Sequence, residues 1–139
     1  MNGVMSSKPP SLPLEELFRA LADPTRLRLL NLIADREICV CYFVGILGIS
    51  QPKISRHLAF LRRAGVVAAR RQGKWMHYRM VTPRDPVAAS ILRDAMKHLR
   101  KKQDFRRDTA KLDTVCCRPG AYKIPEKVPH PALVSIASR

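Results

Sequence analysis

Apolar residues recur at helical spacing in the first quarter of the chain. In "LEELFRALA", residues 14–22, the apolar positions Leu14, Leu17, Phe18 and Leu21 fall on one face of a helix. Asp23 and Pro24 follow, and this pair favours a new helix because Asp is a good N-cap and Pro suits the first helical position. The pattern therefore predicts two helices, over residues 14–22 and 25–34.

The same spacing predicts two further short helices separated by a tight turn. The third covers residues 39–47 and stops at Gly48. The fourth covers residues 51–64, with Ser50 as its cap and Gly65 after its end. Its buried stripe is expected to be Ile54, Leu58 and Leu61.

The period then changes from helix to strand. Residues 66–71 and 76–81 alternate as short strands around Gly73, which predicts a basic hairpin. A long helix is expected over residues 87–107. We expect residues 1–13 to form a flexible leader, residues 14–110 one domain, and the proline-rich residues 111–139 a mostly irregular tail that contains cysteines.

Two short helices with a tight turn, followed by a hairpin, define the fold class. The prediction is a mainly α fold with a small β-hairpin, a winged helix-turn-helix. The fourth helix is then the recognition helix, and the hairpin is the wing.

The net charge of the chain indicates what kind of partner it binds. The chain has 139 residues, with 26 Lys and Arg against 11 Asp and Glu, a net charge of +15. Such an excess favours a polyanion, either nucleic acid or an anionic membrane surface. No apolar run is long enough to span a bilayer, and the first residues do not look like a secretory leader, so we expect a cytoplasmic protein. Its four cysteines should be reduced there, which favours metal binding or redox sensing over a structural disulfide.

The polar face of the fourth helix and the wing supply the candidate DNA contacts. Gln and Arg can contact base edges in pairs of hydrogen bonds, while Ser, Lys and His suit phosphates or mixed contacts. Each residue alone could be an ordinary solvated side chain, and His57 could equally be a structural histidine beneath the helix. The candidates are Ser50, Gln51, Lys53, Ser55, Arg56, His57, Arg70, Arg71, Lys74 and His77.

Three stretches resemble the ArsR/SmtB family of metal-responsive bacterial repressors. They are "LADPTRLRLLNLI", "SQPKISRHLAFLRRAGVV" and "RRQGKWMHYRM", and the resemblance covers residues 14–99. It implies a homodimer, built largely on the first and last helices of that region, that binds a pseudo-palindromic operator in double-stranded DNA. It also implies no enzymatic activity and no cofactor for DNA binding.

The motif "EICVC" resembles the "ELCVC" of arsenic-responsive members of this family. Thiolates are soft ligands that select soft acceptors, and the resemblance implies As(III) or Sb(III) as inducer at Cys39 and Cys41. Those members carry a third cysteine three positions further on, where this chain has Val44. Cys116 and Cys117 could complete the site, from the same chain or its partner, or could form a separate site. Two thiols alone could still hold a monomethylated arsenic(III).

A mechanism follows if both thiols lie on the third helix. Two residues on a helix are separated by about 200° of rotation, so both sulfurs could reach one ion only if the first turn unwinds. Positive surroundings and the helix N-terminus are expected to lower the thiol pKa values. Gly48 and Ile49 join this helix to the recognition helix, so the free protein is expected to repress and the ion-bound protein to release DNA.

Several alternatives stay open at this point. The same fold could sense methylarsenite, Cd(II), Pb(II) or thiol oxidation. A small thiol enzyme would need a CxxC or a phosphate-binding loop after a strand, and the chain contains neither. A membrane-surface role for the basic helix at residues 93–107 would leave the wing unexplained.

Overall fold

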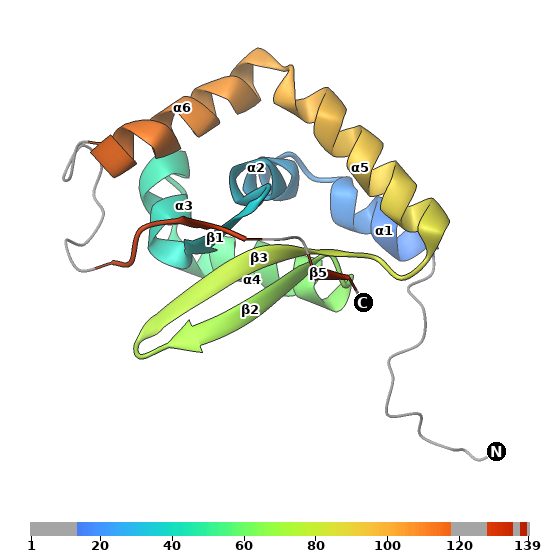
Figure 1. The fold of residues 1–139 in the computed structure, drawn as a ribbon, viewed down its shortest axis with the longest axis horizontal. Helices are drawn as coiled ribbons and strands as arrows, with labels where there is room; N and C mark the ends of the chain where they lie inside the picture. Colours follow the sequence, from blue (N-terminus) through green and yellow to red (C-terminus); the bar gives the residue numbers. More distant parts are fainter. Residues whose placement is uncertain (1–13, 118–127, 135–136, 139) are drawn as a thin grey trace.

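The computed structural model describes residues 14–117, 128–134 and 137–138, so the proposed leader lies outside the described residues (Figure 1). Five helices and three strands follow one another before the last helix and two short strands. The elements are α1 (Leu14–Leu21), α2 (Pro24–Ile33), β1 (Arg36–Cys39), α3 (Val40–Leu47), α4 (Gln51–Arg63), β2 (Val67–Gln72), β3 (Trp75–Thr82), α5 (Pro86–Arg100), α6 (Gln103–Cys117), β4 (Ala132–Leu133) and β5 (Ala137–Ser138).

The predicted helix boundaries rest on local chemistry that the structure confirms. The Asp23 carboxylate accepts a hydrogen bond from the backbone N–H of Arg26 at 3.0 Å, so it caps α2. Gly48 ends α3 in the left-handed conformation, with φ of 65°. Ser50 occupies the N-cap position of α4 without a side-chain capping bond. Asp23 and Gly48 thus fix the start of α2 and the end of α3, whereas the predicted capping bond of Ser50 is not formed.

Helices α3 and α4 form the predicted helix-turn-helix. The three apolar residues expected on α4, Ile54, Leu58 and Leu61, are all fully buried in the core. Helix α4 packs against α2 and α3, and the antiparallel hairpin β2–β3 follows it, turning at Gly73 with φ of 59°. The mainly helical fold with a small hairpin, a winged helix-turn-helix, is therefore confirmed.

Strand β1 was not expected. Residues that we assigned to a loop and to the start of the third helix instead pair antiparallel with β3, with Ile38 opposite Tyr78 and Cys39 opposite His77. The sheet has the order β2-β3-β1-β4, and β5 pairs in parallel with β3. The strand preceding the thiols therefore lies between the wing and β4.

The prediction of one long helix over residues 87–107 is wrong. It breaks after Arg100, and α5 and α6 meet at a sharp bend at the top of Figure 1. The residues between Arg100 and Phe105 are all polar and exposed, so a straight helix there would bury nothing, whereas the bend buries Phe105 and Leu112.

The expectation of an irregular segment from residue 111 onward is also wrong for the residues described. Residues 111–117 continue α6, and residues 132–133 and 137–138 pair with β1 and β3. Sheet pairing between segments so far apart in sequence leaves no local signal. The division between a domain ending at residue 110 and a tail stays a prediction.

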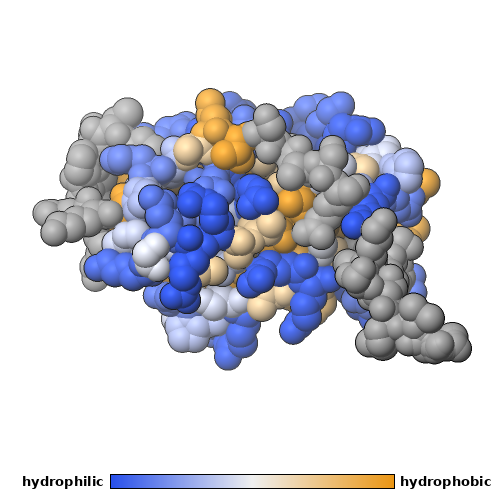
Figure 2. Space-filling model, turned by 60° about the horizontal axis from the view of Figure 1, so that its bottom comes forward, coloured by the Kyte–Doolittle hydropathy of each residue, from blue (hydrophilic) through white to orange (hydrophobic). Residues whose placement is uncertain are grey.

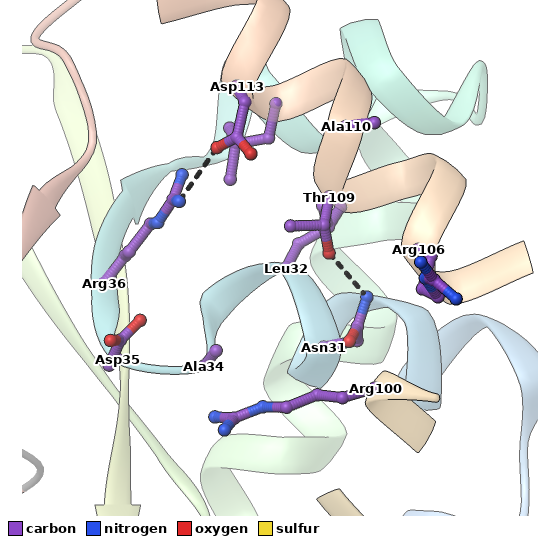
Figure 3. A pocket seen from close by; sticks show the side chains of 11 residues that line it. Asn31, Leu32, Ala34, Asp35, Arg36, Arg100, Arg106, Thr109, Ala110 and Asp113 are labelled. Atoms are coloured by element: carbon purple, nitrogen blue, oxygen red, sulfur yellow. Dashed lines mark hydrogen bonds and ion pairs between the residues drawn. The ribbon is translucent and has the colours of Figure 1, made fainter. Parts of the chain in front are cut away.

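Helix α6 is held on α2 by buried polar contacts. The Arg28 guanidinium donates to both carboxylate oxygens of Asp108, at 2.7 and 2.8 Å, and Asp108 is 1% exposed. The Asn31 side-chain amide donates to the Phe105 carbonyl. It also donates to the Thr109 hydroxyl (Figure 3). None of the described helices is long and apolar enough to cross a membrane.

Candidate thiol site and DNA-binding face

Cys39 and Cys41 lie at the junction of a strand and a helix. Cys39 is the last residue of β1, has extended backbone angles (φ −70°, ψ 144°) and is fully buried. Cys41 is the second residue of α3 and is partly exposed. The two residues therefore do not share a helix, and the separation of about 200° expected for helical positions does not apply.

The two side chains contact each other in the folded protein. The Cys39 thiol lies near enough to Cys41 to act on the pKa of the Cys41 thiol. Burial is the main cause and the neighbouring Cys39 thiol a smaller one, and together they raise the pKa of Cys41 to about 11. The expectation of a lowered thiol pKa is therefore wrong for Cys41, and this thiol is protonated at neutral pH.

The described residues offer no complete ligand set around these thiols. No three Cys, His, Asp or Glu side chains gather closely enough to hold an ion within the part of the chain that the structure describes. Val44, at the position where a third thiol would lie, is a partly exposed residue of α3. A third ligand for an ion at these two thiols would have to come from elsewhere or from a change in conformation.

Cys116 and Cys117 are the last two residues of α6. Helix α6 packs against α3, the helix that carries Cys41, and Figure 1 shows the end of α6 on the same side of the molecule as α3. The side chains of the pair lie outside what the structure describes, so their distance from Cys39 and Cys41 stays untested.

A hollow of about 420 Å³ is lined by residues of α6, of the end of α2 and of β1. Figure 3 shows side chains of both charges around it, with Arg36 paired to Asp113 at 2.9 Å and Arg100 at the opposite side. Among the described residues that line this hollow there is no cysteine or histidine, the ligands that soft ions prefer.

The recognition helix presents its polar face to solvent. Figure 2 looks onto the side that carries the hairpin and shows many hydrophilic side chains across its described part. The exposed residues at the start and along the face of α4 are Ser50, Gln51, Lys53, Ser55 and Arg56. The structure thus leaves these five available for contact.

His57 is placed differently from its neighbours on α4. Its ring nitrogen Nδ1 lies 3.8 Å from the Asp23 carboxylate, and its side chain is only one quarter exposed. It also borders a groove of about 700 Å³ that includes Thr25, Arg26 and Arg63. Thr25 and Arg26 are not among the predicted contacts, because only the folded chain brings the start of α2 beside α4.

The other candidate DNA contacts are on the wing and differ in their surroundings. Arg71 and Lys74 are exposed, and Lys74 lies over the Trp75 ring, 4.9 Å from its centre. Arg70 is partly exposed but forms an ion pair with Glu37.

The prediction that His77 contacts DNA is wrong. His77 is 3% exposed and its Nε2 atom has no hydrogen-bond partner among the residues that the structure describes, so its side chain does not lie on the DNA-facing surface. Burial lowers the pKa of this imidazole, which therefore stays neutral.

Comparison with known proteins gives the family. Residues 23–69, which span α2 to the first half of the wing, match the model of the "Bacterial regulatory protein, arsR family". The arsenical resistance operon repressor of Escherichia coli (strain K12) is 49% identical over 88 residues, which cover 62% of this chain and 74% of that protein. The chain belongs to the ArsR family. Members of this family are DNA-binding transcriptional regulators and not enzymes, which confirms both expectations.

Two further similarities agree with membership of the ArsR family. The arsenic resistance transcriptional regulator ArsR1 of Pseudomonas putida is 54% identical over 65 residues, 46% of this chain and 51% of that protein. The solved structure of reduced HlyU from Vibrio cholerae N16961 has a TM-score of 0.52 and 28% identity, covering 63% of this chain and 84% of that one. The ArsR-family domain is thus shared, while α6 and the strands after it extend beyond the matched family region.

Proposed function

We propose that this ArsR-family protein is a cytoplasmic, arsenic(III)-responsive repressor that binds operator DNA as a homodimer and releases it when its thiols bind the metalloid. The observation that carries the proposal is the contact between Cys39 and Cys41 at the junction that leads into α3, the helix directly before the recognition helix. Two similar proteins named for arsenic resistance support the choice of ligand.

The protonated state of Cys41 favours arsenous acid over a divalent cation. When a thiol replaces one hydroxide of As(OH)₃, the thiol proton leaves with that hydroxide as water and a sulfur–arsenic bond forms. No net proton is released. A divalent ion such as Cd(II) must instead displace one proton into solvent for each thiol, so a raised pKa weakens its binding at neutral pH.

The ligand set decides between inorganic and methylated arsenic. Cys39 and Cys41 supply two thiolates, which suffice for a monomethylated arsenic(III). Trivalent arsenic with three open positions would need one more thiolate, and Cys116 or Cys117 are the remaining cysteines of the chain. Sb(III) follows the same requirement as As(III).

The DNA-binding residues we propose are those that lie exposed on α4 and the wing. Gln51 and Arg56 are suited to base edges, and Lys53, Arg71 and Lys74 to phosphates. Dimerisation would bring two copies of α4 to half-sites about one DNA turn apart. The exposed apolar side chains Phe18 on α1 and Val87 on α5, at 50% and 57% exposure, are the surface we assign to the dimer.

The test is fluorescence anisotropy of a labelled DNA fragment from directly upstream of the gene, in reducing buffer, titrated with arsenite. We expect release by arsenite and none by zinc. Cys39→Ser combined with Cys41→Ser should keep DNA affinity and lose release. Cys116→Ser combined with Cys117→Ser is the matched pair, and loss of arsenite release with retained methylarsenite release would assign these cysteines to the third position.

Two results would refute the proposal. Loss of DNA binding in the untreated Cys39/Cys41 variant would make the thiols structural. Release by peroxide, with no response to arsenite under reducing conditions, would make the protein a thiol-oxidation sensor.

A further inference from the structure

A continuous row of residues connects the thiol strand to the wing. In the sheet order β2-β3-β1, Arg70 lies opposite His77, and His77 lies opposite Cys39. Residues directly opposite each other in antiparallel strands project from the same face of the sheet. Arg70 on the wing and Cys39 at the thiol site are therefore two strands apart on one face.

An ion pair also joins the two outer strands of this row, β2 and β1. The Arg70 Nε atom donates to Glu37 Oε1 at 3.0 Å, and its Nη2 atom donates to the same oxygen. Glu37 is on β1, two residues before Cys39, so its side chain is on the same face as the thiol. Because β3 separates β2 from β1, the Arg70 side chain crosses β3 to reach Glu37, and both charges act on the pKa of His77.

In this ion pair the Glu37 side chain is largely buried, whereas the Arg70 side chain is exposed to solvent. The Glu37 side chain is 12% exposed and the Arg70 side chain 47%. The hydrogen bond from Arg70 is the largest influence on Glu37 and lowers its pKa, so the carboxylate is charged at neutral pH. Arg71, the next residue, projects to the opposite face, is exposed and has no ion-pair or hydrogen-bond partner among the described residues.

We propose that the Glu37–Arg70 pair transmits occupation of the thiol site to the wing, and that Arg70 positions the wing and does not serve as a DNA contact. The inference rests on the proposed function, because it needs an ion at Cys39 and Cys41. Strand β1 is four residues long and is hydrogen-bonded to β3 and β4, so a displacement of Cys39 moves the strand that carries Glu37. The ion pair then pulls on β2, the outer strand of the wing.

This route acts beside the one expected through Gly48 and the recognition helix. A single displacement at the β1–α3 junction would reach α4 through α3 and the wing through Glu37, so both DNA-contacting elements would shift together. The pair thus supplies the differential contact that a wing movement requires.

The experiment measures the ratio of the Kd for DNA with and without saturating arsenite, by anisotropy. Glu37→Gln keeps the shape of the side chain and removes its charge. We expect this variant and Arg70→Gln each to reduce the ratio by about fivefold, within the range typical of allosteric coupling. The double variant should lose no more than either single one, because both remove the same contact.

Arg71→Gln is the matched control, one residue along the same strand. As a phosphate contact it should weaken DNA binding with and without arsenite alike, lower the dependence of log K on log salt by about 0.9, and leave the ratio unchanged. If Arg70→Gln behaves in this way too, Arg70 is a DNA contact and the inference is wrong. An unchanged ratio in Glu37→Gln overturns it as well.

Trp75 gives a second readout that needs no DNA. It is the single tryptophan of the chain and starts β3 at the wing turn. Arsenite should change its emission in the wild-type protein and much less in Glu37→Gln, while absorbance of the arsenic–sulfur bonds shows equal binding. Wild-type protein that binds DNA but shows neither release nor arsenic–sulfur absorbance would refute the proposed function itself, whereas wild-type release with an unaltered Glu37→Gln variant refutes only the inference.

Discussion

Replacing Asp108 by Ala should detach α6 from the rest of the fold at a large cost in stability. The carboxylate is 1% exposed and accepts two charge-assisted hydrogen bonds from Arg28, at 2.7 and 2.8 Å. Removing one partner of a buried ion pair costs about 3–5 kcal/mol, because the other charge is left without compensation. The Arg28 side chain is one third exposed and can regain water, so we expect the lower end, about 3 kcal/mol.

Two further variants separate the causes of this loss. Asp108→Asn keeps the side-chain shape and one neutral acceptor, so it should lose about half as much as Asp108→Ala. Asp104→Ala removes an exposed partner on the same helix, whose pair with Arg107 is 3.3 Å long and whose side chain is 81% exposed. Such surface pairs contribute about 0–1 kcal/mol, so this control should change stability little.

Urea denaturation followed by circular dichroism gives the free energy of unfolding for each variant. DNA affinity, measured well below the unfolding transition, should stay within twofold of wild type, because Asp108 pairs with Arg28 on α2 and not with a residue proposed to contact DNA. Equal losses for Asp108→Ala and Asp104→Ala would refute the reasoning that this buried pair anchors α6.

Three other predictions follow from local geometry. Asp23→Ala removes the N-cap of α2 and should cost about 1 kcal/mol in thermal unfolding; no change in the melting temperature would show that the cap is dispensable. Because its pKa is raised to about 11, the Cys41 thiolate is scarce at neutral pH, so its alkylation by iodoacetamide, located by peptide sequencing, should accelerate as pH rises from 7 to 11. The urea-unfolded chain is the control, and a folded-state rate that levels off near pH 8.5 would contradict the shift. Phe18→Glu places a charge in the proposed dimer surface and should yield monomers in sedimentation, whereas Arg19→Glu, on an exposed neighbour, should not.

The helix-turn-helix could be predicted because its signals are local. Asp23, Gly48 and Gly73 each mark a boundary through their own backbone preferences, and the stripe of α4 has an unambiguous helical period. The bend between α5 and α6 has no proline or glycine to announce it, and its cause is the docking of Asp108 and Phe105 on a distant helix.

The thiol site was only half predictable. The motif "EICVC" identified the residues, but the apolar run that begins at Ile38 does not show where a strand ends and a helix begins. Only pairing with β3 and β4 reveals that Cys39 ends a strand, and the position of Glu37 beside Arg70 depends on that pairing.

The pairing of β4 with β1 has a consequence for synthesis of the protein. The chain folds as it leaves the ribosome, N-terminal elements first. Strand β1 can meet β3 as soon as the wing has emerged, but its outer edge stays open until residues 132–133 arrive and Val134 donates to the Asp35 carbonyl at 2.9 Å. Until then the nascent protein carries an unprotected sheet edge, a surface on which another chain could add a strand. Newly made molecules are thus at their most vulnerable to aggregation in the interval before this short strand closes the sheet.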